Sequence, residues 1–304
     1  MEEILSKHHY RKTFFSIVLL ILVLSLVLRF YTLPYYNPSL KYSYSAFFAL
    51  ILDNLVVSLF ISVFIGAFIF WITPKIVKRS VMEVVDPNQI NPLLKLAASS
   101  TKFWIYRGAC GRYTRATTLP MLAEAAKTEG IGRDITIYLL NPRNEGLCEE
   151  YATYRQSLKS GNKQGAWTQQ IVQEEILATA ICALKYHASQ PLLRVQVFFV
   201  DNFSVFRLDV SDIYVVITKE DKDASALRAD AGTYFYESYK DDIRLIERQA
   251  SEFLFPSKVD VALLNQEAYL RQMLKSTHLF DEAKLDASQI KKIIDRVNKP
   301  ADPY

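Results

Sequence analysis

Residues 54–73 of the chain are NLVVSLFISVFIGAFIFWIT, 20 residues without a charged side chain. Residues 13–33, TFFSIVLLILVLSLVLRFYTL, are also apolar and contain the single charge of Arg29. A helix rises about 1.5 Å per residue, and the hydrocarbon core of a bilayer is about 30 Å thick. Each stretch is therefore long enough to cross a membrane, and together they predict an N-terminal transmembrane hairpin.

A cleavable signal peptide is the alternative for residues 13–33. No small-residue cleavage site follows this stretch, however, and a second span comes soon after it. Basic residues flank the hairpin on its outer sides, whereas the connection between the spans has only Lys41. Because cytoplasmic flanks are enriched in Lys and Arg, we expect a multi-pass protein with both termini in the cytoplasm.

Charge and hydropathy divide the 304 residues into six segments. These are a cytoplasmic N-terminal segment (1–12), transmembrane helix 1 (13–33), a short external loop (34–45), transmembrane helix 2 (46–73), a basic linker (74–100) and a cytosolic domain (101–304). Residues 74–115 contain eight basic and two acidic side chains, a net charge of +6, whereas residues 116–304 contain 23 basic and 27 acidic ones, a net charge of −4. Basic charge beside a membrane favours contact with anionic lipid headgroups.

The cytosolic domain alternates strand-like and helix-like patterns. We predict strands at 102–107, 135–140, 193–200, 205–210 and 212–218, a loop at 161–165, and helices at 119–127, 147–158 and 168–187, with further helices over 231–252, 259–274 and 287–297. Half of all residues are hydrophobic and only nine are glycine, which excludes a disordered or collagen-like chain. The alternation predicts an α/β domain with a partly parallel mixed sheet and flanking helices.

Residues 107–115, RGACGRYTR, lie between a predicted strand and a predicted helix. Five of them are candidate ligand or partner contacts: Arg107, Gly108, Gly111, Arg112 and Arg115. Backbone N–H groups in a glycine turn and guanidinium groups both bind phosphate, so this turn is a candidate anion or nucleotide site. The alternative is a tight strand–helix turn whose arginines are solvated or face lipid, since there is neither a Walker sequence nor G-x-G-x-x-G.

A second candidate cluster follows the predicted strand at 135–140. It comprises Arg143, Tyr151 and Arg155, and the last two are four residues apart, so that they share a face of the predicted helix. Ligands of open α/β sheets bind at the carboxyl ends of strands, where both clusters begin. Ordinary pairing on a helix surface is the alternative.

The predicted spans contain three further candidates, the polar residues Arg29, Asp53 and Asn54. Arg29 and Asp53 lie at similar depths, about 6 and 10 Å from the nearer ends of their spans, so a contact within the hairpin or between protomers is geometrically allowed. Charges inside a membrane are costly unless they are paired or hydrated. We expect a hydrated or oligomeric seam here, with snorkelling of Arg29 to the interface as the alternative.

Signatures of catalysis are largely missing from the sequence. The four histidines have no zinc-site spacing, and there is neither a G-x-S-x-G elbow nor an H-x-K motif. The adjacent carboxylates Glu149–Glu150 and Glu174–Glu175 point about 100° apart on a helix, so we expect solvated helix faces rather than acid–base pairs. We predict no catalytic residue, no metal and no cofactor, and we leave enzymatic activity open while disfavouring it.

Three motifs together resemble a known family. They are YRGACGRYTRATTLP (106–120), ITIYLLNP (135–142) and LCEEYATYR (147–155). The chain resembles the two-transmembrane effectors encoded beside a reverse transcriptase in bacterial retron anti-phage systems, over the hairpin and residues 106–252. Its cytosolic part is distantly similar to phospholipase-D-like domains, but the missing H-x-K argues for a catalytically degenerate, sensing domain.

The resemblance implies an abortive-infection toxin of the bacterial inner membrane. A reverse transcriptase with its RNA-linked DNA would restrain the cytosolic domain, and release would let the hairpins assemble in the lipid as a homo-oligomer that permeabilises or depolarises the membrane. The basic stretch after the second span suits a partner that carries phosphate. Two alternatives remain: a membrane-anchored enzyme acting on nucleotides or lipid phosphodiesters, and an effector gated by a cyclic oligonucleotide.

Overall fold

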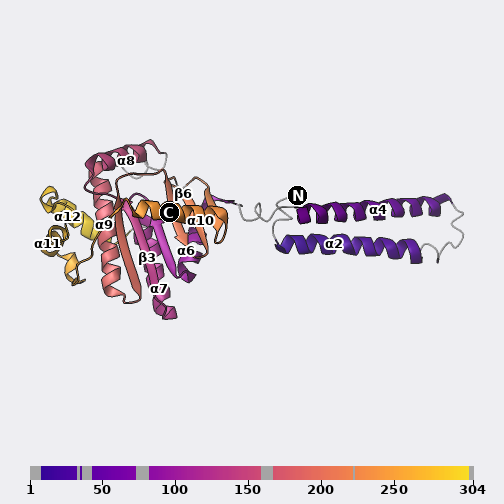
Figure 1. Cartoon of the computed structure of the whole chain (residues 1–304), viewed down its shortest axis with the longest axis horizontal. Helices are drawn as coiled ribbons and strands as arrows, with labels where there is room; N and C mark the ends of the chain where they lie inside the picture. Colours follow the sequence, from indigo (N-terminus) through magenta and orange to yellow (C-terminus); the bar gives the residue numbers. More distant parts are fainter. Residues whose placement is uncertain are drawn as a thin grey trace. The chain divides into compact units, whose positions relative to one another are not determined.

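The computed structural model describes residues 8–32, 35, 43–72, 82–158, 167–221 and 223–300. The chain divides into two compact units, Met1–Lys78 and Arg79–Tyr304, whose elements are drawn in Figure 1. Several sequence predictions fall wholly or partly outside the described residues. They are the N-terminal segment, the external loop at 34–45, the linker before residue 82 and the loop at 161–165.

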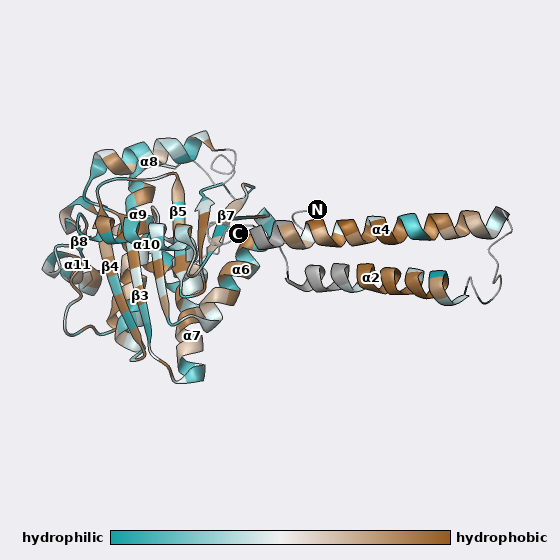
Figure 2. Cartoon of the chain, turned by 45° about the vertical axis from the view of Figure 1, so that its right-hand side comes forward, coloured by the Kyte–Doolittle hydropathy of each residue, from teal (hydrophilic) through white to brown (hydrophobic). Residues whose placement is uncertain are grey.

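The first unit consists of two helices that lie side by side. They are α2 (His8–Val27), which ends in the π-helical turn η1 (Leu28–Thr32), and α4 (Ser43–Ile72). Within α4, the 23 residues Ala46–Phe68 are long and apolar enough to span a membrane. Figure 2 shows a hydrophilic band inside this otherwise hydrophobic helix. The apolar part of α2 and η1, Ser16–Thr32, is shorter. The described residues thus contain one helix of spanning length, and the two-span hairpin stays a prediction.

The second unit is built on an eight-stranded mixed sheet in the order β1-β7-β6-β5-β2-β3-β4-β8. The strands are β1 (Glu83–Val85), β2 (Phe103–Arg107), β3 (Arg133–Leu140), β4 (Leu193–Val200), β5 (Phe206–Ser211), β6 (Tyr214–Lys219), β7 (Ala226–Asp230) and β8 (Ser251–Glu252). Strands β2, β3 and β4 are parallel and every other pairing is antiparallel. The predicted α/β class with a partly parallel mixed sheet and flanking helices is confirmed.

Helices cover both faces of the sheet. They are α6 (Pro87–Ser100), η2 (Thr114–Thr118), α7 (Leu119–Glu129), α8 (Glu145–Ser157), α9 (Gln169–Ser189), α10 (Tyr234–Glu247), η4 (Leu263–Asn265), α11 (Glu267–Ser276), η5 (Glu282–Lys284) and α12 (Ala287–Asn298). Helices α6, α7 and α9 contact one another in one layer. On the opposite face, α10 reaches Phe103 and Arg107, whose side chains alternate along β2 with the buried Trp104 and Tyr106.

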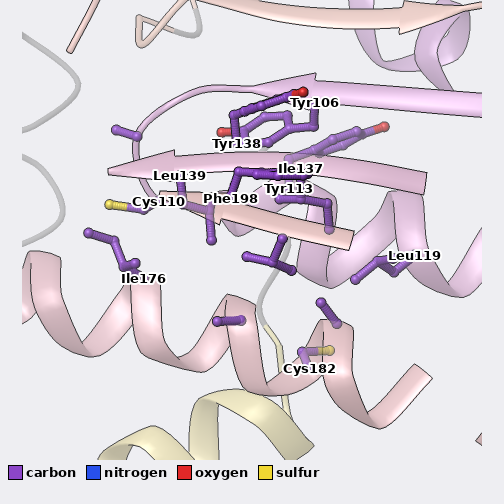
Figure 3. Packing of buried hydrophobic residues seen from close by; sticks show 14 of the residues in the cluster. Tyr106, Cys110, Tyr113, Leu119, Ile137, Tyr138, Leu139, Ile176, Cys182 and Phe198 are labelled. Atoms are coloured by element: carbon purple, nitrogen blue, oxygen red, sulfur yellow. The ribbon is translucent and has the colours of Figure 1, made fainter. Parts of the chain in front are cut away.

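Helix α9 is the centre of the domain. It packs on β4 and contacts α7, α8 and α12, so that residues 172–184 are all buried. Figure 3 shows Ile176 and Cys182 on the side of α9 that faces the strands. The hydroxyl of Thr168 accepts a hydrogen bond from the Ile171 N–H at 3.2 Å and caps the helix, which was predicted over 168–187. A helix buried on every side must also bury the polar residues within it.

The predicted linker over 74–100 is too long. Strand β1 pairs with β7, and α6 packs on α7 with Ile90 and Leu94 buried, so residues 83–100 belong to the second unit. Pro87, within the predicted linker, is the first residue of α6. Proline suits this position because the N–H that it lacks has no partner inside a helix. Any linker therefore ends before Glu83.

Other elements also differ from the sequence prediction. Strand β7 was not predicted, and the predicted helix at 259–274 begins only at Glu267. The predicted helix over 231–252 is shorter, since α10 ends at Glu247 and residues 251–252 form β8. Strand β7 has the sequence ALRAD, whose half-exposed Leu227 and Arg228 give no clear alternation of apolar and polar residues. Its place in the sheet depends on pairing with β6 and β1 rather than on its own composition.

Candidate functional site at the carboxyl edge of the sheet

The two predicted clusters do meet, at the carboxyl edge of the parallel strands. The N–H of Leu140, at the end of β3, donates a hydrogen bond to the Ala109 carbonyl in the turn after β2, at 3.1 Å. Arg112 from this turn and Arg155 from α8 both stack on Trp167, with guanidinium carbons 5.6 and 4.9 Å from the ring centroid. The shared aromatic ring joins the two clusters, which sequence spacing alone did not show.

Both glycines of the turn serve its packing. A Cβ atom on Gly108 would lie 2.2 Å from the Tyr106 hydroxyl, and Gly111 has a φ of +66° with Thr179 at 2.8 Å from the position of a Cβ. The Gly108 N–H donates to the Tyr138 carbonyl at 3.1 Å, and the Gly111 N–H donates to the Tyr106 hydroxyl at 3.2 Å. These two N–H groups are thus used inside the fold, which corrects the prediction that they cradle a phosphate.

Arg115 is an internal residue rather than an open anion contact. Its side chain is only 3% exposed, and its Nη2 lies 2.5 Å from Glu175 Oε2. Its Nη1 donates to the Thr179 hydroxyl at 2.8 Å and to the Glu175 carbonyl at 3.0 Å. Arg115 belongs to the π-helical turn η2, and a widened turn of this kind re-aims a side chain. The guanidinium therefore ties the turn after β2 to α9.

The carboxylates of α9 complete this charge cluster. Glu174 and Glu175 are buried, whereas the sequence predicted a solvated helix face. Arg296 of α12 contacts both of them, with its Nε 3.2 Å from Glu175 Oε1, and Arg112 lies 3.8 Å from the same oxygen. The prediction was wrong because α12 and η2 cover this part of α9 from outside the local sequence. Glu149–Glu150 are exposed as predicted.

Tyr151 and Arg155 share one face of α8, as their spacing predicted, and that face points into the domain. Arg155 Nη1 donates to the Glu220 carbonyl at 2.5 Å and lies 3.4 Å from its carboxylate. The Tyr151 ring contacts Trp167 and Phe203, with centroids 6.3 and 5.8 Å away. Burial raises the pKa of the Tyr151 hydroxyl well above its usual value, so this group stays protonated.

Arg143, Arg112 and Arg107 are the predicted arginines nearest to solvent, and the Arg112 side chain is 22% exposed. Arg107 keeps a side-chain exposure of 17% and lies 3.7 Å from Asp242 of α10. Arg143 is exposed, and its backbone N–H donates to the Asn141 side-chain oxygen at 3.1 Å. Among the eight predicted residues, Arg143 therefore has the side chain most accessible to a ligand or partner.

Strand β5 contains a buried ion pair that the sequence did not predict. Asp209 is 2% exposed, and its Oδ2 lies 3.4 Å from Arg207 Nε. Burial raises the pKa of Asp209 to about 6, against the opposing effect of Arg207 and of the Trp104 N–H. In the sequence, FRLDVS shows two charges in a strand pattern, which normally indicates a solvated face. Tertiary contacts enclose this strand: α6 packs against β5, and Arg207 lies beside the turn at Gly108.

The possible metal ligands and the three cysteines among the described residues favour neither metal nor thiol chemistry. Within the described ranges of the chain, no group of three or more His, Cys, Asp or Glu side chains is placed to hold a metal ion. The three cysteines are buried, and burial raises the pKa of Cys148 to about 12 and that of Cys182 to about 11. A buried thiol with a raised pKa is a poor nucleophile.

No protein-family model and no curated protein matches this chain. Its chemistry therefore has to be argued from its own residues. At the carboxyl edge most of the predicted arginines are engaged with Glu175, Glu220 or Asp242. Such pairs between a turn, a helix and a strand end stabilise one arrangement of these elements. These pairs hold the turn after β2, α8 and the residue after β6 in one arrangement at the carboxyl edge.

Proposed function

We propose that this chain is a membrane-anchored anti-phage effector. Its cytosolic α/β domain is a catalytically inactive regulator, and its membrane helices permeabilise or depolarise the bacterial inner membrane. The partner that restrains it is a reverse transcriptase with its RNA-linked DNA, as the sequence resemblance implies. The observation that supports a membrane-active role most directly is the ion pair between Arg29 and Asp53.

This ion pair joins the two helices of the first unit. Arg29 Nε donates to Asp53 Oδ1 at 2.7 Å, and Arg29 Nη2 donates to Oδ2 at 3.1 Å. Asp53 is the eighth residue of Ala46–Phe68, which places it about 10 Å into the span. A fork of two charge-assisted hydrogen bonds offsets part of the cost of charge in hydrocarbon. Ionisable residues kept at such depth are typical of ion pathways and assembly seams.

In this proposal α2 with η1 forms the span that precedes α4 in the sequence. The 17 residues of Ser16–Thr32 rise about 26 Å as a helix, and a bilayer thins locally to accommodate a short span. Two spans with basic outer flanks leave both termini in the cytoplasm. Two helices cannot enclose a pore, so activity requires several protomers.

The experiment is to express the full-length chain in bacteria without its partner and to record membrane potential with a fluorescent dye. We expect depolarisation by the wild type and none by the double variant Arg29→Leu/Asp53→Leu, which removes both charges together. Ser62→Ala is the matched control, because Ser62 lies in the same span and its hydroxyl bonds only its own helix, at the Ser58 carbonyl. An unchanged potential despite verified insertion of the wild type contradicts the proposal.

A further inference from the structure

Helix α4 has a carboxylate and an amide at the same depth of its span. Asp53 and Asn54 are the eighth and ninth residues of Ala46–Phe68, so both lie about 10–12 Å from its start. That depth is within the hydrocarbon core, where neither water nor lipid tails offer hydrogen bonds. Consecutive helical residues point about 100° apart, so the two side chains occupy neighbouring sectors of the helix.

Asn54 lies on the part of α4 that α2 leaves open. The covered or half-covered positions of α4 recur every three or four residues: Ala49, Leu52, Val56, Leu59 and Val63. Asn54 is exposed, and so are Ser58 and Ser62, one and two turns further on. Within the described part of the chain, no hydrogen bond involves the Asn54 amide. Its two donors and its acceptor therefore need partners from another molecule.

Asp53 is only partly satisfied by Arg29. Its side chain remains 49% exposed, compared with 21% for Arg29. A carboxylate has about four acceptor positions, and Arg29 supplies two donors. Acceptor positions thus stay open toward the surroundings of the hairpin, at the depth where Asn54 has unused donors. The two groups complement each other, but one helix cannot bring its own Asn54 back to its own Asp53.

We propose that the Asn54 amide of one protomer donates hydrogen bonds to the Asp53 carboxylate of a second copy of this chain. The proposal rests on the membrane placement of α4 in the proposed function and names the contact through which the hairpins assemble. In the proposed arrangement each protomer donates through Asn54 to one neighbour and accepts through Asp53 from another; such head-to-tail contacts repeat until a ring closes. The small side chain of Ser58, one turn after Asn54, lets a neighbouring helix approach closely. The ring gathers the Arg29–Asp53 pairs into one polar belt.

The first test measures the oligomeric state of the full-length protein in lipid nanodiscs by native mass spectrometry. We expect oligomers for the wild type and at least a tenfold lower oligomer fraction for Asn54→Leu. The same drop is expected for Arg29→Leu/Asp53→Leu, which lacks the acceptor but keeps Asn54. Ser62→Ala, as the matched control, keeps the wild-type distribution. A wild type without oligomers, or an Asn54→Leu variant with the wild-type distribution, overturns the proposal.

The second test mixes the two deficient variants with different mass tags. The Asn54→Leu chain keeps an intact acceptor, and the Arg29→Leu/Asp53→Leu chain keeps an intact donor, so each mixed pair can form one contact. We expect mixed dimers without larger rings. A mixture that stays monomeric contradicts the head-to-tail contact. Homodimers of the Arg29→Leu/Asp53→Leu chain alone contradict it as well, because a symmetric Asn54–Asn54 interface gives that result.

Membrane potential separates this inference from the proposed function. If Asn54→Leu is monomeric and still depolarises cells, or if depolarisation persists while the mixture stays monomeric, the assembly contact is wrong for the activity and the effector function stands. If the wild type assembles through Asn54 and never changes the potential, the contact stands and the proposed function fails.

Discussion

Each of the two units contains an arginine–carboxylate pair, and the two pairs differ in burial and in the number of partners. In the second unit, the Arg115 and Glu175 side chains are 3% and 10% exposed, and Glu175 also contacts Arg112 and Arg296. In the first unit, Asp53 has only Arg29 and stays half exposed. A buried pair is kept where several partners satisfy it, because leaving one charge unpaired in an interior is costly.

The difference indicates separate roles for the two pairs. The hydrogen bonds of Arg115 go to α9, so this pair stabilises the fold at the carboxyl edge. The contacts of Asp53 leave hydrogen-bonding capacity unused, at a depth that lacks water in the proposed membrane span. Capacity that a single chain does not use is available to another molecule. The interior pair is therefore structural, and the membrane pair is the better candidate for activity.

The largest expected effect comes from breaking the interior pair. Arg115→Met leaves Glu175 buried with weaker partners, so the free energy of unfolding falls by about 3 kcal/mol or more. For a domain of this size that lowers the melting temperature by about 6–12 °C. Tryptophan fluorescence of the detergent-solubilised chain reports the transition through Trp167, which stacks on Arg112 and Arg155. Glu149→Gln, on an exposed position of α8, serves as the control and shifts the midpoint by less than about 2 °C.

Loss of the Arg29–Asp53 pair is expected to have no effect on the melting temperature in the same assay. Arg29→Leu/Asp53→Leu removes both charges and replaces them with groups that hydrocarbon solvates, so the melting temperature of the second unit stays unchanged. Depolarisation and assembly are lost instead. Equal effects of the Arg115 and Arg29/Asp53 changes on stability contradict the division into a structural and an active pair.

The next largest effect is the pH dependence due to Asp209. Its folded-state pKa of about 6 lies above the unfolded value near 3.9, so the folded state binds the proton more readily. The destabilisation by this carboxylate is therefore present above pH 6 and is lost as pH falls through 6 toward 4, by up to about 3 kcal/mol. We expect wild type to gain stability relative to Asp209→Asn over this range in denaturant titrations. If the difference in stability between wild type and Asp209→Asn is constant with pH, the pKa of Asp209 is not raised in the folded state.

A smaller effect is expected at the glycine turn that leads to Arg115. Gly111 and Gly130 share a φ of +66°, but a Cβ on Gly111 meets Thr179 at 2.8 Å, while a Cβ on Gly130 meets nothing within 4 Å. Gly130→Ala costs about 1 kcal/mol for the backbone alone. Gly111→Ala costs roughly 1–3 kcal/mol more, because packing must shift as well. Equal melting temperatures for the two variants contradict this account of the turn.

The smallest effect on stability is expected for Arg143→Ala, since Arg143 is exposed. The melting temperature changes by less than about 2 °C. The same variant tests the nucleotide alternatives. Under the proposed function, a panel of mononucleotides and cyclic dinucleotides leaves the wild-type melting temperature unchanged. A stabilising shift by one of them that Arg143→Ala abolishes favours a nucleotide receptor or enzyme instead.

Local patterns predicted most of the elements of the second unit. The strands at 102–107, 135–140 and 193–200 and the helix capped by Thr168 appear within a few residues of their predicted bounds. Each has a strong periodicity of apolar residues within its own sequence, or a side chain that caps the helix. Strand β7 lacks such a period, and α6 was hidden by two prolines: Pro87, which suits its first position, and Pro92, which lies inside the helix.

The residues predicted for the candidate site do gather there, but several of them have partners that were not predicted. Arg115, Gly108 and Gly111 lie together at the carboxyl edge, yet their donors bond Glu175, Tyr138 and Tyr106. The acidic residues that pair with Arg115 and Arg155 come from α9 and from the residue after β6, 60 and 65 positions away, and Asp242 of α10 pairs with Arg107 from further along the chain. No local spacing encodes such a pairing.

Local composition was sufficient to determine an apolar span in α4, its basic flanks and an alternating α/β domain. These features depend on the length and period of hydrophobic runs, which each segment contains in full. Tertiary contacts decided which charged side chains are buried and which remain exposed. Burial depends on segments distant in the chain, such as α12 over Glu174, and on whether α2 covers a given side of α4. The same residue types therefore stabilise the fold at Arg115 and remain available to a partner at Asp53.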